Sequence, residues 1–411
     1  MTNEELVPHL FRAEHSKIVA VLCRVFGFEH IEIAEDIASE TFAAAIETWP
    51  YKGVPPNPTA WLYTVAKNKA KNHLQRNQLF AGKISSELTK HHQEFEDALD
   101  ISEQNITDSQ LQMLFAVCNP VIPSEGQVGL ALRILCGFGI DEVATAFLTN
   151  KATIEKRLYR AKEKLRQHQV AIEFPPDKEI DNRLGAVLTT LYLLFSEGYY
   201  SENKDNVIRE ELCLEAMRLT QLLLANPQTN RPEVNALFAL MCFQASRFKA
   251  RKNDNGETVL YGDQDESLWN YHLIEQGMKY LREASHGDRL STYHLEASIA
   301  YWNTIKADTH EKWENILQLY NQLLQIKYSP IAALNRTFAL SKANGKEIAI
   351  IEVEKLQLTD NQFYFALLGE LYAGIDDQKA IENFGKALKL AKTKTDKHTI
   401  QRKIDTIAAK A

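Results

Sequence analysis

The 411-residue sequence lacks the features of membrane-bound and secreted proteins. No apolar run approaches the roughly 20 residues that a membrane span requires, and the N-terminus has acidic residues where a secretion signal needs basic ones. The five cysteines lie far apart and form no C-x-x-C pair, which disfavours disulfides and structural zinc. We therefore expect a cytoplasmic protein with no membrane segment and with reduced core thiols at Cys23, Cys118, Cys136, Cys213 and Cys242.

The motifs of common enzyme and metal sites are also missing. There is no Walker loop, no G-x-S-x-G and no H-E-x-x-H, and the twelve histidines are scattered. His91-His92 lies in an acidic stretch where a solvated loop is more typical than a metal clip. The stretch Asn253-Asp254-Asn255-Gly256 resembles part of a calcium loop. Arg251 stands at the first ligand position, where the loop needs an oxygen ligand, so this resemblance fails. We expect no enzymatic activity, no cofactor and no bound metal.

The charges are distributed unevenly, although the net charge is only −7. No acidic residue occurs between Glu47 and Glu87, whereas lysines and arginines recur in that window. A second basic run covers residues 151–166 and contains only Glu155 and Glu163 as acids. Residues 79–110, between the two runs, are predominantly acidic. Two separate basic segments indicate local contacts with nucleic acid in spite of the acidic total.

Helical periodicity dominates the sequence, so we predict an all-α fold. Four parts are expected: a helical unit at residues 1–78, an acidic linker at 79–108, a second helical unit at 109–170 and a helical extension at 180–411. The turn Phe174-Pro175-Pro176-Asp177 marks the boundary before the extension. A small hairpin is expected at residues 248–260, where Asn255-Gly256 favours a tight turn.

The extension contains a repeated pattern. Leu334-Asn335-x2-Phe338 and Leu368-Gly369-x2-Tyr372 are 34 residues apart, which is the tetratricopeptide period. The second copy continues as Ala380-x3-Phe384-x2-Ala387, one residue closer to Gly369 than is usual. Upstream segments drift from a fixed period, so we predict a degenerate array of helical repeats.

The first basic segment predicts a helix from Ala60 to Arg76, with Thr59 as its N-cap. Its outer face has cations and amides but no carboxylate, which suits phosphates and base edges. This face comprises Thr64, Lys67, Asn68, Lys71, Asn72, Gln75 and Arg76. An ordinary solvated helix surface would show the same pattern.

The preceding helix is predicted at residues 31–49 and is expected to end before Pro50. It carries Glu32, Asp36, Glu40 and Glu47 on one side, while Ile33, Ile37, Thr41, Ala45 and Ile46 are predicted to turn inward. An acidic helix beside a basic one is consistent with a docking surface and also with simple surface complementarity.

Residues 140–166 predict a helix-turn-helix, with a second helix that starts at Lys151 after a cap at Thr149 or Asn150. Its inner stripe comprises Ile154, Leu158, Ala161 and Leu165. Because a recognition helix places its N-terminal part in the major groove, we expect Thr153, Lys156 and Arg157 to read bases and Arg160 and Lys164 to hold phosphates. The alternative is an ordinary helical hairpin with a basic face.

Three motifs occur in a consistent order: AEDIASETF at residues 34–42, WLYxxAKN at 61–68 and TIxxRLxRAKxxLR at 153–166. Together they resemble the sigma-70 family, extracytoplasmic-function group, over most of residues 7–170. The motif LLFSEGYY at residues 193–200, Leu237-x2-Leu240-Met241 and Asp263-Gln264-Asp265-x3-Trp269 resemble the long C-terminal extension of one subgroup, which ends in tetratricopeptide-like repeats.

The resemblance implies a transcription initiation factor with two partners, promoter DNA and bacterial core RNA polymerase through its β′ clamp and β subunit. The acidic helix with Glu32, Asp36 and Glu40 would bind the clamp. The 51–58 loop and the helix after it would melt and read the minus-ten element, through Trp61, Lys67, Asn68, Lys71, Asn72 and Arg76. The minus-thirty-five element would be read by Thr153, Lys156, Arg157, Arg160 and Lys164. The linker would thread the RNA channel of the polymerase, and the extension would regulate the sigma module.

Other classes of protein remain as alternatives. A helix-turn-helix regulator with a ligand- or partner-sensing repeat domain explains residues 109–411 equally well but gives residues 7–78 no role. In a pure repeat scaffold, the basic helices would be solvated surface. Glu197, Asp263 and Asp265 could line a ligand pocket in the extension, although capping and turn roles are more typical of such spacing.

Overall fold

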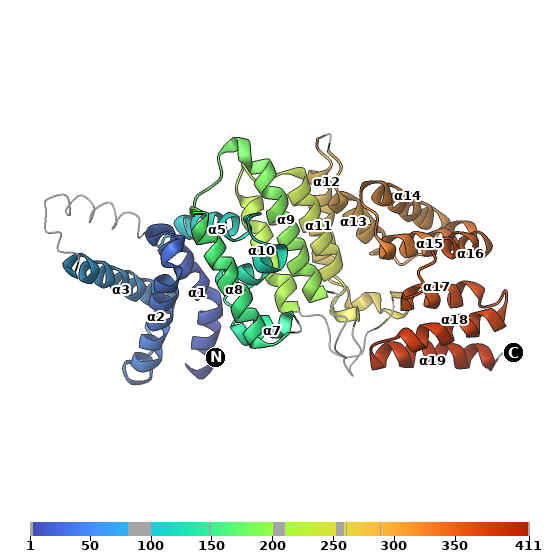
Figure 1. The fold of residues 1–411 in the computed structure, drawn as a ribbon, viewed down its shortest axis with the longest axis horizontal. Coiled ribbons are helices and arrows are strands. Elements are labelled where there is room, and N and C mark those ends of the chain that lie inside the picture. The colour runs from blue at the N-terminus through green and yellow to red at the C-terminus, as the bar shows by residue number, and fades with distance from the viewer. Residues whose placement is uncertain are drawn as a thin grey trace. The chain divides into compact units, whose positions relative to one another are not determined.

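The structure is a computed structural model that describes residues 3–80, 100–147, 149–199, 210–251, 259, 261–287 and 289–409, without the side chains of 3–5, 77–80, 394 and 395. Every regular element among these residues is helical, which confirms the predicted all-α fold (Figure 1). The chain divides into two compact units, one of Met1–Leu194 with Ala225–Thr229 and one of Phe195–Leu224 with Asn230–Ala411. The division falls inside helix α9, Asp177–Tyr199.

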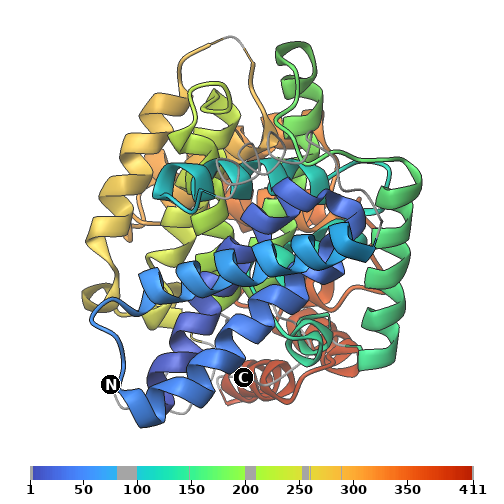
Figure 2. The same ribbon diagram turned by 90° about the vertical axis from the view of Figure 1, so that its left-hand side faces the viewer.

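The N-terminal unit is built around its first helix. Its longer helices before α9 are α1 (Asn3–Phe26), α2 (Ile31–Lys52), α3 (Pro58–Phe80), α5 (Glu103–Val117) and α8 (Lys151–Gln167). Residues 18–23 of α1 are each at most 1% exposed, and six consecutive residues cover more than a full helical turn. This part of α1 is therefore buried on all sides, and the helix packs against α2, α3 and α5. Figure 2 shows α1, α2 and α3 side by side.

The prediction that helix α2 ends before Pro50 is wrong. It continues to Lys52, and its last hydrogen bond runs from Gly53 N to Trp49 O at 3.0 Å. A proline so close to the end removes only the bond to the carbonyl of residue 46, and Ile46 is 59% exposed at the surface. The prediction that Ile46 turns inward is also wrong, whereas Ile37, Thr41 and Ala45 are buried as predicted.

Helix α3 begins at Pro58, two residues earlier than predicted. Its cap is Asn57, whose Oδ1 accepts from the backbone N–H of Ala60 at 3.0 Å, and Pro58 takes the first helical position. Proline suits that position because its missing N–H would have no partner there. Thr59 is therefore not the cap.

Only residues 79, 80 and 100–108 of the predicted acidic linker are described, and His91-His92 lies outside them. At its C-terminal end the linker is shorter than expected, because α5 already begins at Glu103. Ser102 caps this helix, and its Oγ accepts from Asn105 N at 3.4 Å. The helical periodicity of α5 is hard to recognise at its first turn, where Glu103 and Gln104 are both polar.

The helix-turn-helix predicted at residues 140–166 is formed by α7 (Ile140–Ala146) and α8. Before it lie α6 (Ser124–Leu130) and the π-helical turn Ala131–Leu135. Both α6 and α7 pack against α8. Ile154, Leu158, Ala161 and Leu165 of α8 are all buried, which confirms the predicted inner stripe. Helix α9 joins this unit through Thr190 Oγ1, which donates to Gln127 Oε1 at 2.8 Å.

The C-terminal unit is a succession of helices that pack on their neighbours in the chain. They are α10 (Glu210–Ala225), α11 (Pro232–Ala245), α12 (Tyr271–Ala284), α13 (Thr292–Trp302), α14 (His310–Ile326), α15 (Pro330–Asn344), α16 (Lys346–Glu354), α17 (Gln362–Tyr372), α18 (Asp377–Leu390) and α19 (Lys394–Ala408). From α13 onward each helix packs against the next (Figure 1).

The predicted repeat motif holds α17 against α18. A Cβ on Gly369 would lie 2.8 Å from the ring of Phe384, so only glycine allows this close approach. Ala380, Phe384 and Ala387 are at most 1% exposed. Of the hairpin predicted at residues 248–260, its turn Asn255-Gly256 lies outside the described residues. Its flanks are joined by Val259 N, which donates to Arg251 O at 2.9 Å.

All five cysteines are buried, and none of them forms a disulfide. Burial raises the pKa of Cys118, Cys213 and Cys242 to about 12. These thiols are therefore protonated and packed as small apolar groups. Within the described part of the chain, no helix is long and apolar enough to cross a membrane.

Candidate functional site

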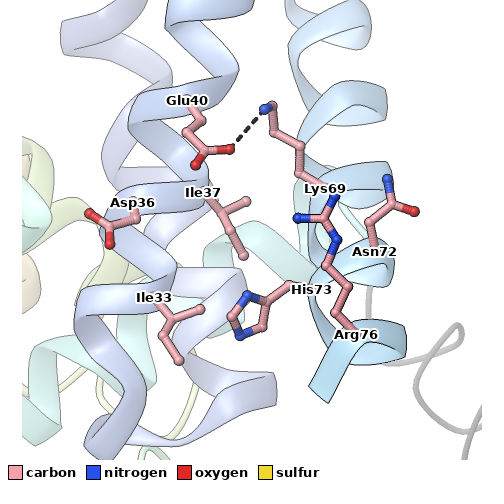
Figure 3. A pocket seen from close by; sticks show the side chains of 8 residues that line it. All are labelled: Ile33, Asp36, Ile37, Glu40, Lys69, Asn72, His73 and Arg76. Atoms are coloured by element: carbon pink, nitrogen blue, oxygen red, sulfur yellow. Dashed lines mark hydrogen bonds and ion pairs between the residues drawn. The ribbon is translucent and has the colours of Figure 1, made fainter. Parts of the chain in front are cut away.

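The acidic helix α2 and the basic helix α3 enclose a groove of about 260 Å³ (Figure 3). Its lining residues are Ile33, Asp36, Ile37, Glu40, Lys69, Asn72, His73 and Arg76. Lys69 Nζ and Glu40 Oε2 form an ion pair at 2.8 Å across it, and the Glu40 side chain is still 64% exposed. Asp36 is exposed as well. Two of the three predicted docking carboxylates therefore line one open groove.

The outer face of α3 carries the residues predicted to contact promoter DNA. Asn68, Asn72 and Arg76 are exposed, while Lys67 and Lys71 are half-buried. Trp61 is half-buried at the start of the helix. Its ring packs edge-on against that of Trp49, with 5.4 Å between the two ring centroids. Trp49 is 2% exposed and fixes the position of Trp61. Amide and guanidinium groups thus lie along one side of the helix, with an aromatic ring at its start.

The helix-turn-helix presents a second basic surface. Asn150 caps α8, because its Oδ1 accepts from Thr153 N at 2.8 Å and from Thr153 Oγ1 at 2.9 Å. Lys156, Arg160 and Lys164 are exposed. Arg157 is half-buried, with its guanidinium 5.1 Å from the centroid of the Phe147 ring. Thr153 and Arg157 therefore take part in the turn's own structure, whereas the other three predicted residues extend into solvent.

The C-terminal half of α8 contacts α2 directly. Lys162 Nζ lies 2.8 Å from Glu35 Oε2 and 3.8 Å from Glu32 Oε1, and Arg166 forms a hydrogen-bonded ion pair with Glu32. Arg133 Nε, from the π-helical turn, lies 3.5 Å from Glu35 Oε1. We call this group of five residues the α2–α8 contact. The Glu35 and Lys162 side chains are only 15% and 14% exposed, so water screens their attraction weakly.

Comparisons with known proteins agree with this geometry. Residues 10–80 match the family Sigma-70 region 2, a stretch that comprises most of α1 and all of α2 and α3. Residues 183–285 match a family of unknown function, DUF6596. The chain is 34% identical over 391 residues to an uncharacterized protein of Rhizobium meliloti (strain 1021). The aligned region covers 93% of this chain and 92% of that protein. No solved structure matches the chain.

The N-terminal part of the chain is a sigma-70 region 2, which supports a sigma factor of the sigma-70 family. This region supports a role in transcription initiation and implies binding to core RNA polymerase and promoter DNA. Of the residues predicted from the sequence, α2 and α3 bring together Asp36, Glu40, Asn72 and Arg76 at the groove. The third predicted docking carboxylate, Glu32, lies elsewhere, in the α2–α8 contact.

The α2–α8 contact of this sigma factor contains residues that no sequence motif predicted as partners. Burial raises the pKa of Glu32, but the hydrogen bonds from Arg166 and from its own backbone and the charges of Lys162 and Arg166 outweigh this and lower it. Glu32 is therefore a carboxylate at neutral pH. Glu35 stands in the motif at residues 34–42, yet its partner Lys162 lies 127 residues away. In the sequence, only the opposite charges of the two segments indicate that they could pair. Charge alone does not identify which lysine or arginine binds Glu35.

A buried histidine lies near the same contact in the sigma factor. His15 of α1 is 4% exposed, and its Nε2 is 3.4 Å from Ser39 Oγ. Burial and the charge of Arg133 lower the pKa of His15 to about 4, against an opposing effect of Glu35. His15 is thus neutral at physiological pH.

Arg12 of the same helix forms an ion pair with Glu142 of α7 at 3.0 Å, which adds a second polar link between region 2 and the helix-turn-helix.

Proposed function

We propose that this sigma factor belongs to the extracytoplasmic-function group and directs bacterial core RNA polymerase to its promoters in the cytoplasm, with no catalytic activity of its own. One observation carries the proposal. The matched region 2 contains an acidic groove on α2 immediately beside the carboxylate-free face of α3, with Asp36 and Arg76 in the same groove. A polymerase surface and a DNA strand could therefore be bound by neighbouring helices.

In this proposal α2 binds the β′ clamp through its exposed carboxylates. Asp36 and Glu40 lie beside Ile33 and Ile37 in the groove, so a basic partner helix would find charge and apolar surface together. Charge complementarity of this kind speeds association and selects the partner. Glu32 is the third residue of this surface; its side chain is 52% exposed and forms an ion pair with Arg166.

Helix α3 melts and reads the minus-ten element. Opening DNA requires a surface that holds bases away from the stack and binds phosphates at the same time. Trp61 offers an aromatic ring, Asn68 and Asn72 offer amides that both donate and accept, and Arg76 offers a cation. Lys67 and Lys71 lie half-buried on the same helix and add two cations to this surface.

Helix α8 reads the minus-thirty-five element as duplex DNA. Its capped N-terminus carries Thr153, Lys156 and Arg157, which suits base edges, and Arg160 and Lys164 follow on the exposed side. Lys162 and Arg166 bind α2 instead. The cations of α8 are thus divided between DNA and region 2.

The helical extension regulates the sigma module, and its last helices form a tetratricopeptide-like array. The support for this is the close approach of Gly369 to Phe384, together with the packing of each helix on the next. Because the extension makes up more than half of the chain and contains the family of unknown function at residues 183–285, it is the natural place for signal input. Its partner is a protein or a small ligand.

Run-off transcription with purified bacterial core polymerase tests the proposal. The full chain is compared with a chain that ends at Leu194, because this end preserves the bond between Thr190 and Gln127. We expect promoter-dependent transcripts from genomic fragments, and their gain or loss on truncation reveals the sign of regulation. Absence of transcripts and of co-purification with core polymerase would favour the helix-turn-helix regulator, which leaves α1–α3 without a role.

A further inference from the structure

The C-terminal unit contains two buried cations beside one aromatic ring. Lys312 is 1% exposed and Arg247 is 9% exposed. Lys312 Nζ lies 5.0 Å from the centroid of the Tyr261 ring, and Arg247 Cζ lies 5.5 Å from the same centroid. Lys312 Nζ also donates to Tyr261 Oη at 2.9 Å and to Ile305 O at 2.5 Å. The structure therefore concentrates positive charge where water has little access.

No carboxylate neutralises either cation among the described residues. The charges of Asp308 and, more weakly, of Glu266 act on Lys312, and Asp308 is itself paired with Lys342 at 2.9 Å. Burial lowers the pKa of Lys312, the charge of Asp308 opposes this, and the charge of Arg247 lowers it further. Two like charges buried together cost free energy unless an anion compensates them, since protein interiors solvate ions poorly.

Three buried polar atoms of the same cluster have no hydrogen-bond partner in the described structure: Arg247 Nε, Gln264 Oε1 and Trp269 Nε1. Gln264 and Trp269 are each 4% exposed. Buried polar atoms normally have partners, so three such atoms in neighbouring segments of one unit indicate hydrogen bonds to something else. Two of them are N–H donors and suit an anion, and the third is an acceptor that suits a hydroxyl group.

Backbone hydrogen bonds hold these segments together. Asn270 N donates to Ser246 O at 2.8 Å, which joins the residue after Trp269 to the residue before Arg247. Gln264 Nε2 donates to Val259 O at 3.4 Å, and Val259 N donates to Arg251 O. Arg247 Nη2 reaches Tyr199 Oη at 3.4 Å. Tyr199 of the motif at residues 193–200 thus contacts Arg247, and the backbone after the motif at 263–269 is bonded to the residue before Arg247.

We propose that this cluster is a binding site for a small hydroxylated anion, a carboxylate or a phosphate ester of metabolite size. Arg247 and Lys312 supply the charge, Arg247 Nε and Trp269 Nε1 donate to the anion's oxygens, and Gln264 Oε1 accepts from its hydroxyl group. Tyr261 holds both cations against its ring and keeps them in place before the anion binds. Binding requires neither polymerase nor DNA, so its test is separate from that of the sigma function.

Thermal unfolding of the full chain tests the site, with citrate as the carboxylate probe and glycerol phosphate as the phosphate probe, at ionic strength matched with sodium chloride. We expect one of the two to raise the Tm by roughly 3–6 °C when present at about tenfold its Kd. The anion that acts decides between carboxylate and phosphate. The Lys312→Met variant keeps the stem of the side chain and removes the charge, so it should abolish the shift.

The same variant separates a ligand site from a structural role. If Lys312 is an uncompensated cation, Lys312→Met keeps or raises the Tm without anion, because an apolar group of similar volume replaces a buried charge. The matched control is Lys342→Met, whose charge is 40% exposed and paired with Asp308; it should keep the anion response. Absence of any shift in the wild type, or an equal shift in Lys312→Met, overturns the proposal.

Discussion

Two faces of helix α2 carry carboxylates in different surroundings. On the groove side, Asp36 is exposed and Glu40 is 64% exposed with a single partner, Lys69. On the side toward α8, Glu35 is 15% exposed and lies between Lys162 and Arg133. An exposed ion pair contributes little to stability, whereas removal of one partner from a shielded pair leaves a charge poorly solvated. The groove face is thus available to a partner, and the other face holds region 2 against the helix-turn-helix.

The largest effect should come from Asp36→Arg on the groove face. It reverses a charge that binds no other residue strongly, so we expect affinity for core polymerase to fall by roughly 100-fold while the fold is kept. A titration of labelled protein with core polymerase measures this, with circular dichroism as the check on folding. The control is Glu47→Arg, which makes the same charge change on α2 outside the groove. Wild-type affinity in Asp36→Arg would contradict the docking role.

Glu35→Gln should give the next largest effect, on stability. It leaves Lys162 and Arg133 as two shielded cations without their shared carboxylate, and we expect a loss of about 1–3 kcal/mol. Faster amide exchange in α8 should accompany this loss, because the contact holds that helix. Glu40→Gln is the matched change on the groove face and should cost no more than about 0.5 kcal/mol. Equal losses in the two variants would mean that the faces do not differ.

A third prediction concerns how α8 divides its cations. Arg160→Ala removes an exposed charge, so we expect promoter affinity of the holoenzyme to fall by about 5–10-fold with an unchanged Tm. Arg166→Ala removes the partner of Glu32, so it should lower the Tm and affect promoter affinity less. Filter binding at two salt concentrations and thermal unfolding separate the two variants. A larger promoter defect in Arg166→Ala would reverse the assignment.

Local features of this molecule were predictable from the sequence because they depend on neighbouring residues. The 3.6-residue period of Ile154, Leu158, Ala161 and Leu165 gave α8 and its buried stripe, and Asn150 was one of two predicted caps. The exposed side of α3 followed from the same periodicity. Errors occurred where a local rule meets a helix end, since Pro50 is tolerated in the last turn of α2.

The contacts between distant segments could not be predicted in the same way. The sequence offers many lysines and arginines as candidate partners for Glu35. Its pairing with Lys162 depends on how α1 packs against α2 and α5. The cluster of Arg247 and Lys312 is a further example, because Arg247 lies in the turn after α11 and Lys312 in α14, and only folding places both beside Tyr261. Charge patterns indicate that a residue needs a partner, whereas tertiary packing decides which one.

The smallest effect separates Glu32 from Glu35 within the α2–α8 contact. The pKa of Glu32 is below its usual value in the folded chain, so its ion pair with Arg166 contributes stability above the pKa of the unfolded chain and loses it as the pH falls through the lower folded value. Because the Glu32 side chain is 52% exposed, we expect wild type to exceed Glu32→Gln by only about 0.5 kcal/mol at neutral pH. Denaturant unfolding from neutral to acidic pH measures this difference, which should shrink toward zero on acidification and also in high salt. A difference that grows on acidification would mean that the carboxylate of Glu32 is not what Arg166 binds.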